Sequence, residues 1–374
     1  MRVLQLIDSL QAGGAERVAV NYANDLATRV EKSFLCATRK EGGLKNSLSN
    51  NVEYLFLKKN SALDLKAINK LNSFVRKNNI AIIHSHTSSY FIGTLIKIIN
   101  PKIKLLWHEH YGNRDQTSAF SKIILKSCSY FFSCIITVNE YLKTRSKQKL
   151  KAKGVFFLPN YVSNNNILHS TILHGKVNKR VVCLANFRPD KDHINLLKAF
   201  KKLVKTHSDW SLHLVGQDFG DEYSKIIKHF IQEHNLEKQV FIYGSCLDVS
   251  NILSQSTIGV LSSKSEGLPL ALLEYGLAKL PVVVTNVGDC NLVVKNDFLG
   301  KKLNLNIFTF EGKHQIVDEA IHIFNTGQIP PNTSLHNPQG LVILNKYCNY
   351  LEFEKRLEYD KYFTEIEIIL KESK

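Results

Sequence analysis

The sequence has far fewer acidic than basic residues. It contains 33 Asp and Glu against 49 Lys and Arg, which gives a formal net charge of +16 at pH 7. A surplus of this size favours nucleic acid, phosphorylated substrates or an anionic membrane surface as partners. Long apolar runs are also missing, since none reaches the roughly 18 residues that a membrane span needs. The short apolar stretch before Asp8 predicts a first strand and not a signal peptide.

Cysteine pairs of the kind that bind metals or form redox centres are absent. The seven cysteines are scattered, mostly inside apolar runs, and none forms a Cys-x-x-Cys pair. An odd number of scattered cysteines in a long chain is typical of reduced, buried thiols. We therefore expect a cytoplasmic protein, which can also attach peripherally to the inner face of the cell membrane.

Short apolar runs alternate with helix-like segments along two stretches of the chain, separated by the polar stretch 160–179. At roughly 100–200 residues per domain, 374 residues suggest two domains. Strands that alternate with helices predict parallel sheets covered on both faces. We expect an α/β fold of two Rossmann-like, doubly wound domains that face each other across a cleft. The expected ranges are an N-terminal domain at 1–162, a linker at 163–179, a C-terminal domain at 180–340 and helices at 341–374 that return to the N-terminal domain.

The segment 262–278, SSKSEGLPLALLEYGLA, joins a strand end, a loop and a helix start. Pro269 suits the first turn of a helix expected over Pro269–Ala278, because the N–H that proline lacks is not needed there. The free N–H groups at a helix start bind anions such as a diphosphate. Glu266 on the loop and Glu274 on the helix would repel a diphosphate, so we expect them to accept hydrogen bonds from sugar and ribose hydroxyls. Two glutamates on an ordinary surface helix are the alternative.

This segment resembles the retaining GT-B glycosyltransferases, in particular the family-4 group. The family pattern is a strand, Ser-x-x-Glu-Gly and a helix that carries a second Glu, and it matches this chain from Ser263 to Glu274. The resemblance implies that Glu266 contacts hydroxyls of the donor sugar and that Glu274 contacts the ribose. The backbone that would hold the phosphates is that of Gly267, Leu268 and Leu270.

Two motifs of the N-terminal domain extend the resemblance. QAGGAERV (11–18) is similar to the family's first-strand loop, where glycines such as Gly13 and Gly14 let the backbone approach donor and acceptor. It is not a Gly-x-Gly-x-x-Gly fingerprint, which argues against a dehydrogenase. LLWHEHYG (105–112) is similar to the family strand that ends in a histidine, here His110, near the transferred sugar and the diphosphate. The alternative for the glycine loop is an ordinary tight turn. The alternative for His110 is a polar residue at a strand end whose hydrogen bonds are satisfied within the protein.

Four histidines lie near the ends of two predicted strands, at positions 84, 86, 108 and 110. Because residues two apart share one face of a strand, these side chains could also be interpreted as a metal site. No carboxylate or Cys ligand is evidently supplied beside them. We therefore expect no metal.

The C-terminal domain carries a basic loop within CLANFRPDKDHINLLKAF (183–200). Lys191 matches the family's diphosphate-binding lysine. The usual arginine lies five residues earlier, where this chain has Asn186, so Arg188 is expected to substitute. VFIYGS (240–245), with Gly244, matches the strand whose end meets the nucleobase, and TNVGD (285–289) matches a loop that closes that side of the pocket.

The resemblance implies metal-independent transfer of a sugar from a nucleotide-diphosphate sugar, with retention of anomeric configuration. A UDP-sugar is the expected donor and no further cofactor is expected. His110, Glu266 and Lys191 are the expected catalytic residues, and cations neutralise the leaving diphosphate. In family members the C-terminal domain binds the donor and the N-terminal domain the acceptor, here expected to be a glycan or a lipid-linked acceptor of bacterial cell-surface polysaccharide synthesis.

Two other functions compete with this interpretation. A GT-B nucleotide-sugar epimerase would share the donor site, and a basic nucleic-acid-binding protein would share the charge. The basic residues show no regular aromatic interleaving and no reading motif, so we expect no nucleic-acid partner. Six basic residues and no acidic one lie between Lys143 and Lys153, just after the apolar stretch 121–132. We expect the apolar residues to be core and the basic ones to form either a solvated helix face or a contact with an anionic membrane.

Overall fold

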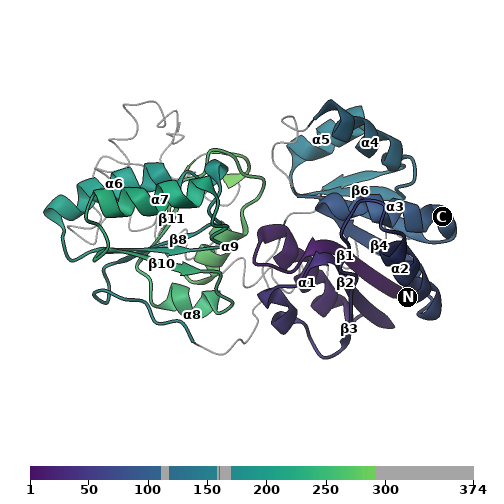
Figure 1. The fold of residues 1–374 in the computed structure, drawn as a ribbon, viewed down its shortest axis with the longest axis horizontal. Coiled ribbons are helices and arrows are strands. Elements are labelled where there is room, and N and C mark those ends of the chain that lie inside the picture. Colours follow the sequence, from purple (N-terminus) through teal and green to yellow (C-terminus); the bar gives the residue numbers. More distant parts are fainter. Residues whose placement is uncertain (111–117, 158–159, 161–169, 281, 286, 291–374) are drawn as a thin grey trace. The chain divides into compact units, whose positions relative to one another are not determined.

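The computed structural model describes residues 1–110, 118–157, 160, 170–280, 282–285 and 287–290. The chain divides near residue 165 into two compact units, each with its own parallel sheet (Figure 1). The expected helices at 341–374 and residues 163–169 of the expected linker lie outside the described residues. Within the described part, no helix is long and apolar enough to cross a membrane.

The first unit contains a seven-stranded sheet in the order β3-β2-β1-β4-β5-β6-β7. Its central strands are buried along most of their length, because helices cover both faces of the sheet. The strands are β1 (Arg2–Ser9), β2 (Lys32–Lys40), β3 (Val52–Phe56), β4 (Ile82–His86), β5 (Lys104–Glu109), β6 (Cys134–Thr137) and β7 (Val155–Phe157). The helices are α1 (Gly14–Leu26), α2 (Leu65–Lys77), α3 (Tyr90–Ile99), α4 (Ala119–Ser129) and α5 (Glu140–Lys149), with short 3₁₀ turns η1 (Gly43–Ser47) and η2 (Thr87–Ser89).

Alternate residues of the strands build two different layers in this unit. Leu4 and Leu6 of β1 belong to an apolar core with α2, α3 and α4. The residues between them point to the opposite face, where Tyr22 of α1 contacts the ring of His84. The histidines therefore lie on the α1 face of the sheet.

The second unit contains a five-stranded parallel sheet in the order β10-β9-β8-β11-β12. Helices α6 and α7 contribute to the main core of this unit, against strands of the sheet. The strands are β8 (Arg180–Leu184), β9 (Ser211–Val215), β10 (Val240–Gly244), β11 (Ile258–Leu261) and β12 (Val282–Val284). The helices are α6 (His193–Thr206), α7 (Glu222–Glu233), α8 (Val249–Ser254) and α9 (Leu270–Leu277), preceded by the 3₁₀ turn η4 (Pro189–Lys191).

The two doubly wound parallel sheets agree with the fold class expected from the sequence, but one local expectation was wrong and another holds only in part. Pro269 is the N-cap of α9 with an extended backbone (ψ 123°) and does not lie in the first turn. In the apolar stretch 121–132 the expectation holds for Leu125 and Phe132, which belong to the core, but not for Ile123, Tyr130 and Phe131, which are exposed. The core needs only one face of α4, and hydrophobicity alone does not tell which face that is.

Candidate functional site

The order of strands in the second sheet creates a natural binding position. The chain builds the sheet outward from β8 to β9 and β10, and then returns to place β11 on the other side of β8. In open parallel sheets ligands bind at such a switch point, beyond the carboxyl ends of the strands. The loop after β8 carries Arg188 and Lys191, and the loop after β11 carries Glu266 and Gly267. The two expected donor-binding loops are therefore neighbours.

Hydrogen bonds hold these two loops together. The Ser262 hydroxyl donates to the carbonyl oxygen of Lys191 (2.9 Å). The Lys264 N–H donates to the carbonyl oxygen of Asp190 (2.7 Å). Since both bonds use the backbone of the β8 loop, they fix where the Lys191 side chain begins.

Lys191 and Glu266 form an ion pair at this position. The Lys191 Nζ donates to Glu266 Oε1 at 2.6 Å, and the Ser263 hydroxyl donates to the same oxygen at 2.5 Å. The Lys191 side chain is 23% exposed and that of Glu266 is 7% exposed. Among the described residues no bond to Glu266 Oε2 is found, so this oxygen is left to accept from a ligand hydroxyl. The Lys191 ammonium has three N–H donors and uses one of them in the bond to Glu266.

The loop after β12 supports the backbone at Glu266. The Asp289 N–H donates to the Gly267 carbonyl oxygen (2.9 Å). Gly288 has φ +58°, and a Cβ at this position would lie 2.1 Å from the Glu266 carbonyl oxygen. Only glycine fits such a close approach. The part of 285–289 that the structure describes thus packs directly against the Glu266 loop.

Helix α9 begins directly after the loop that carries Glu266. Leu268 and Leu270 are buried, so only their backbone can serve a ligand, as the resemblance implies. Glu274, on the second turn, is half-buried.

Tyr275 is a residue of this helix that we did not single out from the sequence. It is fully buried, its OH donates to the Val260 carbonyl oxygen (3.0 Å) and it accepts from the Leu184 N–H (2.8 Å). It thereby fixes α9 to β8 and β11. The sequence feature that could have indicated this contact is Gly259, whose missing side chain leaves room for the tyrosine ring.

Asn186 and Arg188 differ in what they do. The Asn186 side-chain oxygen accepts from the Gln217 N–H (2.8 Å), which ties the β8 loop to the loop after β9. Arg188 is exposed, and its guanidinium lies 5.5 Å from the centre of the Phe219 ring. A cation over a ring face keeps its charge while its position is restricted. Arg188 is thus available as a cation on the loop that carries Lys191.

Gly244 ends β10 in the left-handed region, with φ +66°. Its carbonyl oxygen accepts from the Gly216 N–H at the end of β9 (2.8 Å). A Cβ at Gly244 would meet no atom within 4 Å. The backbone is therefore open at this strand end, where a flat group such as a base could approach.

The first unit has its own switch point, between β1 and β4. The loop after β1 leads to Gly13, the N-cap of α1, and Gly14 is the first residue of that helix. His86 is the last residue of β4, and His110 follows the end of β5. The expected residues of the N-terminal domain therefore all follow strands at or beside this switch point.

His86 links His110 to the interior of the sheet. His86 Nδ1 lies 3.0 Å from His110 Nε2, and His86 Nε2 lies 2.8 Å from Gln5 Oε1. Burial lowers the pKa of His86 well below its usual value, so the ring is neutral. Since the Gln5 oxygen only accepts, His86 Nε2 carries the proton and its Nδ1 accepts from His110 Nε2. The His110 ring is thus held with one nitrogen directed at His86.

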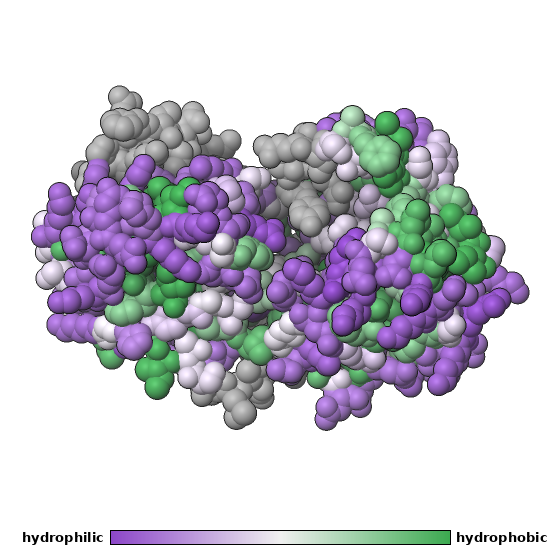
Figure 2. All heavy atoms as spheres, in the orientation of Figure 1, coloured by the Kyte–Doolittle hydropathy of each residue, from purple (hydrophilic) through white to green (hydrophobic). Residues whose placement is uncertain are grey.

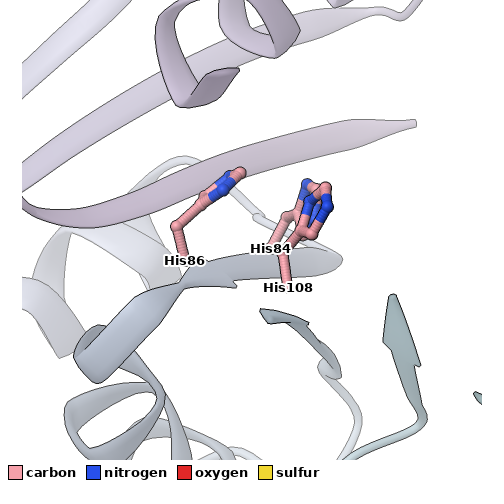
Figure 3. Close-up of side chains that lie close together, drawn as sticks. All are labelled: His84, His86 and His108. Carbon is pink, nitrogen blue, oxygen red and sulfur yellow. The ribbon is translucent and has the colours of Figure 1, made fainter. Parts of the chain in front are cut away.

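Three of the histidines form a buried cluster (Figure 3). One ring nitrogen of each of His84, His86 and His108 lies within 4.8 Å of the others. Burial lowers the pKa of His84 to about 3 and that of His108 well below its usual value. However, both nitrogens of His86 are already hydrogen-bonded, and the His84 and His108 rings stack at 14°. Stacked rings do not direct their lone pairs to one point as tetrahedral zinc requires, so we interpret the cluster as packing that supports His110.

Asp8 is a charged residue at this switch point that the sequence reasoning did not single out. It lies near the end of β1, and its two carboxylate oxygens accept from the hydroxyls of Thr38 and Ser88. In the sequence, Asp8 could have been noticed as an acidic residue directly after the mostly apolar run 3–7. It ties β1 to β2 and η2, which shapes the loop before Gly13.

Comparisons with known proteins identify related sequences and a similar fold. A family model described as Glycosyltransferase Family 4 matches residues 12–164, and one described as Glycosyl transferases group 1 matches residues 164–321. The chain is 28% identical over 296 residues to an uncharacterized glycosyltransferase of Haemophilus influenzae, with 74% of this chain and 77% of the relative covered. It is 26% identical over 320 residues to the Escherichia coli UDP-Gal:alpha-D-GlcNAc-diphosphoundecaprenol alpha-1,3-galactosyltransferase, with 78% and 81% covered. The fold is similar to that of Anabaena HepE in complex with UDP and glucose, with a TM-score of 0.71, 17% identity and 98% and 99% of the two chains covered.

Proposed function

The chain belongs to the glycosyltransferases of the group 1, family-4 type and has their GT-B fold, and on this basis we propose that it is a retaining, metal-independent enzyme. It moves a sugar from a nucleotide-diphosphate sugar to a glycan or lipid-linked acceptor in bacterial cell-surface polysaccharide synthesis. The observation that carries this proposal is the Lys191–Glu266–Ser263 cluster at the switch point of the second unit. It combines a cation for phosphate with a carboxylate oxygen for a sugar hydroxyl.

The donor binds at the second unit in this proposal. Its diphosphate lies at the N-terminus of α9, against the backbone of Gly267, Leu268 and Leu270, where the helix dipole favours negative charge. Lys191 and Arg188 provide cations for the charge that develops on the departing nucleotide diphosphate. Their positive charge serves the role that a metal ion serves in other transferases.

The carboxylates orient the donor and do not attack it. Glu266 Oε2 accepts from a hydroxyl of the sugar, and Glu274 accepts from the ribose. The acceptor hydroxyl attacks C1 on the face from which the diphosphate leaves. The C1–O bond to phosphate breaks as the new bond forms, and the hydroxyl proton passes to a leaving-phosphate oxygen, so the anomeric configuration is retained. His110, oriented by His86, contacts the transferred sugar.

The donor and acceptor classes are supported by the relatives. Anabaena HepE binds UDP and glucose, and the Escherichia coli relative uses UDP-Gal and a diphosphoundecaprenol-linked acceptor. We therefore propose a UDP-sugar as donor. A lipid-linked acceptor would also bring this protein to the anionic inner surface of the cell membrane, from the cytoplasm.

A thermal-shift panel of UDP-, GDP- and ADP-sugars tests the donor site. A ligand at 100 times its dissociation constant stabilises the folded state by about 2.7 kcal/mol. We expect one nucleotide class to raise the unfolding temperature, Lys191→Ala to abolish that rise, and Lys225→Ala, an exposed lysine on α7, to leave it unchanged. If no nucleotide sugar shifts the protein, or if Lys191→Ala behaves as wild type, the site assignment is wrong.

Product analysis separates the proposal from its rivals. With an acceptor present, NMR of the new linkage should show the anomeric configuration of the donor. Conversion of the donor sugar without any acceptor would instead identify a nucleotide-sugar epimerase. Salt-dependent binding to nucleic acid, without affinity for nucleotide diphosphates, would identify a nucleic-acid-binding protein.

A further inference from the structure

Helix α4 presents an apolar stripe to solvent. Phe120 is 72% exposed, Ile123 is 63% exposed, and Tyr130, just after the helix, is 65% exposed. Positions three and seven apart share one side of a helix, so 120, 123, 127 and 130 form one line. The opposite side of α4 supplies its buried residues, Leu125, Cys128 and Ser129. The helix therefore satisfies the core with one face and leaves large apolar side chains on the other.

Basic charge surrounds this stripe. Lys122 and Lys126 are exposed on α4 itself. From residue 118 to residue 157 the chain has eight basic residues and one acidic residue, Glu140, a local net charge of 8 − 1 = +7. That single carboxylate is 2.9 Å from the ammonium of Lys143. Between 118 and 157 the charge is thus almost entirely of one sign.

The basic segment after α5 lies beside the end of α4. The Lys151 N–H donates to the Ser129 hydroxyl at 2.9 Å, which joins the two segments. Lys147, Lys149, Lys151 and Lys153 are all exposed. Figure 2 shows hydrophobic side chains gathered over the part of the first unit that contains α3, α4 and α5, with hydrophilic ones around them. Apolar and basic groups therefore share one surface.

We propose that this surface, the α4 face, docks on an anionic membrane. We define the α4 face as Phe120, Lys122, Ile123, Lys126 and Tyr130. Aromatic and apolar side chains that enter the boundary between headgroups and acyl chains, with lysines that contact anionic headgroups, are the features of an interfacial helix. A second copy of this chain fits less well, because two patches with the same positive charge repel each other.

The α4 face deepens the proposed function, because a lipid-linked acceptor is presented at such a membrane. It also gives a role to Ile123 and Tyr130, which were expected in the core but are exposed. The lysines of 143–153 then act together with α4 and not as a separate basic segment.

Co-sedimentation with lipid vesicles, in the absence of donor and acceptor, tests this surface. We expect the full chain to bind vesicles of phosphatidylglycerol and phosphatidylcholine, and binding to weaken as salt rises from 0.05 to 0.5 M. The double variant Phe120→Asp/Ile123→Asp should weaken the partition by at least about ten-fold, since two apolar side chains no longer enter the bilayer. Lys122→Glu/Lys126→Glu should weaken it by a similar factor, at about five-fold per basic residue removed.

Leu65→Asp is the matched control, because Leu65 on α2 is also 72% exposed but lies outside the α4 face. Its binding should equal that of wild type, and all three variants should keep the wild-type unfolding temperature and the shift caused by the nucleotide sugar. Equal binding to pure phosphatidylcholine, or wild-type binding by both α4 variants, would overturn the proposal. Loss of a dimer in Phe120→Asp/Ile123→Asp, with vesicle binding unchanged, would show that a second copy covers the face. Failure of the donor site would appear separately, as normal vesicle binding without any nucleotide shift.

Discussion

Replacing Glu266 with glutamine changes the charge of the proposed donor site without changing the shape of the side chain. Glu266 Oε1 accepts from both Lys191 and Ser263, and the oxygen of a glutamine amide can accept from the same two donors. Oε2, however, becomes an NH₂ group. A group that should accept from a sugar hydroxyl then becomes a donor.

The expected losses of folding stability and of activity follow from the two bonds at Oε1 and the open position at Oε2. A hydrogen bond to a charged group contributes about 1.5–3 kcal/mol and a neutral one about 0.5–1.5 kcal/mol, so Glu266→Gln should cost about 1 kcal/mol of folding stability. At about 1.4 kcal/mol per factor of ten, losing a charged acceptor in the transition state should lower kcat/KM by about 10- to 150-fold. The change should therefore be small for folding and large for catalysis.

Two other variants complete the test. Lys191→Met leaves the Glu266 carboxylate, which is 7% exposed, without its cation, and should destabilise the fold more than Glu266→Gln does. Glu237→Gln, at an exposed position, is the control and should behave as wild type. Thermal unfolding and initial rates with the donor found in the panel provide both measurements.

A small effect of Glu266→Gln on activity would contradict a direct contact between Oε2 and the transferred sugar. If Glu266→Gln kept kcat/KM within about two-fold of wild type, Oε2 would not accept from the transferred sugar. If it lost activity only in proportion to lost folded protein, Glu266 would be a structural partner of Lys191 and nothing more.

Three further variants or conditions give simple outcomes. Burial lowers the pKa of His193 to about 4 and that of His213 to about 3. Each neutral ring therefore makes its full contribution to folding stability above the unfolded pKa near 6.5. As the pH falls from 6.5 towards the folded pKa, the free energy of unfolding decreases by about 1.4 kcal/mol per pH unit for each histidine. The unfolding temperature should therefore drop steeply between pH 6.5 and pH 4, and a flat profile would contradict neutral buried rings. Gly288→Ala should destabilise the fold by more than the roughly 1–2 kcal/mol that a left-handed alanine costs, because the new Cβ would clash with the Glu266 carbonyl oxygen. The same clash should weaken donor binding, and unchanged affinity in a nucleotide titration would contradict that contact. Tyr275→Phe should cost about 1–3 kcal/mol in denaturant unfolding, because it leaves the half-buried Leu184 N–H and the buried Val260 carbonyl oxygen without the hydroxyl that they share. A neutral result would show that another group replaces the hydroxyl.

Much of each unit could be predicted from local pattern. Parallel strands covered on both faces are largely apolar, so β6 and β11 could be recognised as short apolar runs. Helix α6 (His193–Thr206) carries buried residues at helical spacing, namely Leu196, Leu197, Phe200 and Leu203. Helix α9 was expected one residue too early, because proline at the N-cap and proline in the first turn have the same sequence signature.

The candidate site was predicted less completely. Lys191 and Glu266 could each be named from local motifs, but their 2.6 Å contact joins residues 75 positions apart. Asp8, Tyr275 and Gly288 were missed or left without a role, because each acts on a neighbour from another strand or loop. A motif records what a segment contains, whereas these contacts depend on which strand ends lie next to each other.

The sequence by itself determined the class of fold, the loops proposed to bind phosphate and sugar hydroxyls, and the excess of positive charge. These features are local, since they follow from the period of apolar residues and the residue types at strand ends. Only the tertiary structure decided that β11 lies beside β8, that Glu266 spends one carboxylate oxygen on Lys191 and Ser263, and that Phe120 and Ile123 face solvent. Strand order and the choice of buried helix face depend on packing between distant segments, which no local pattern encodes.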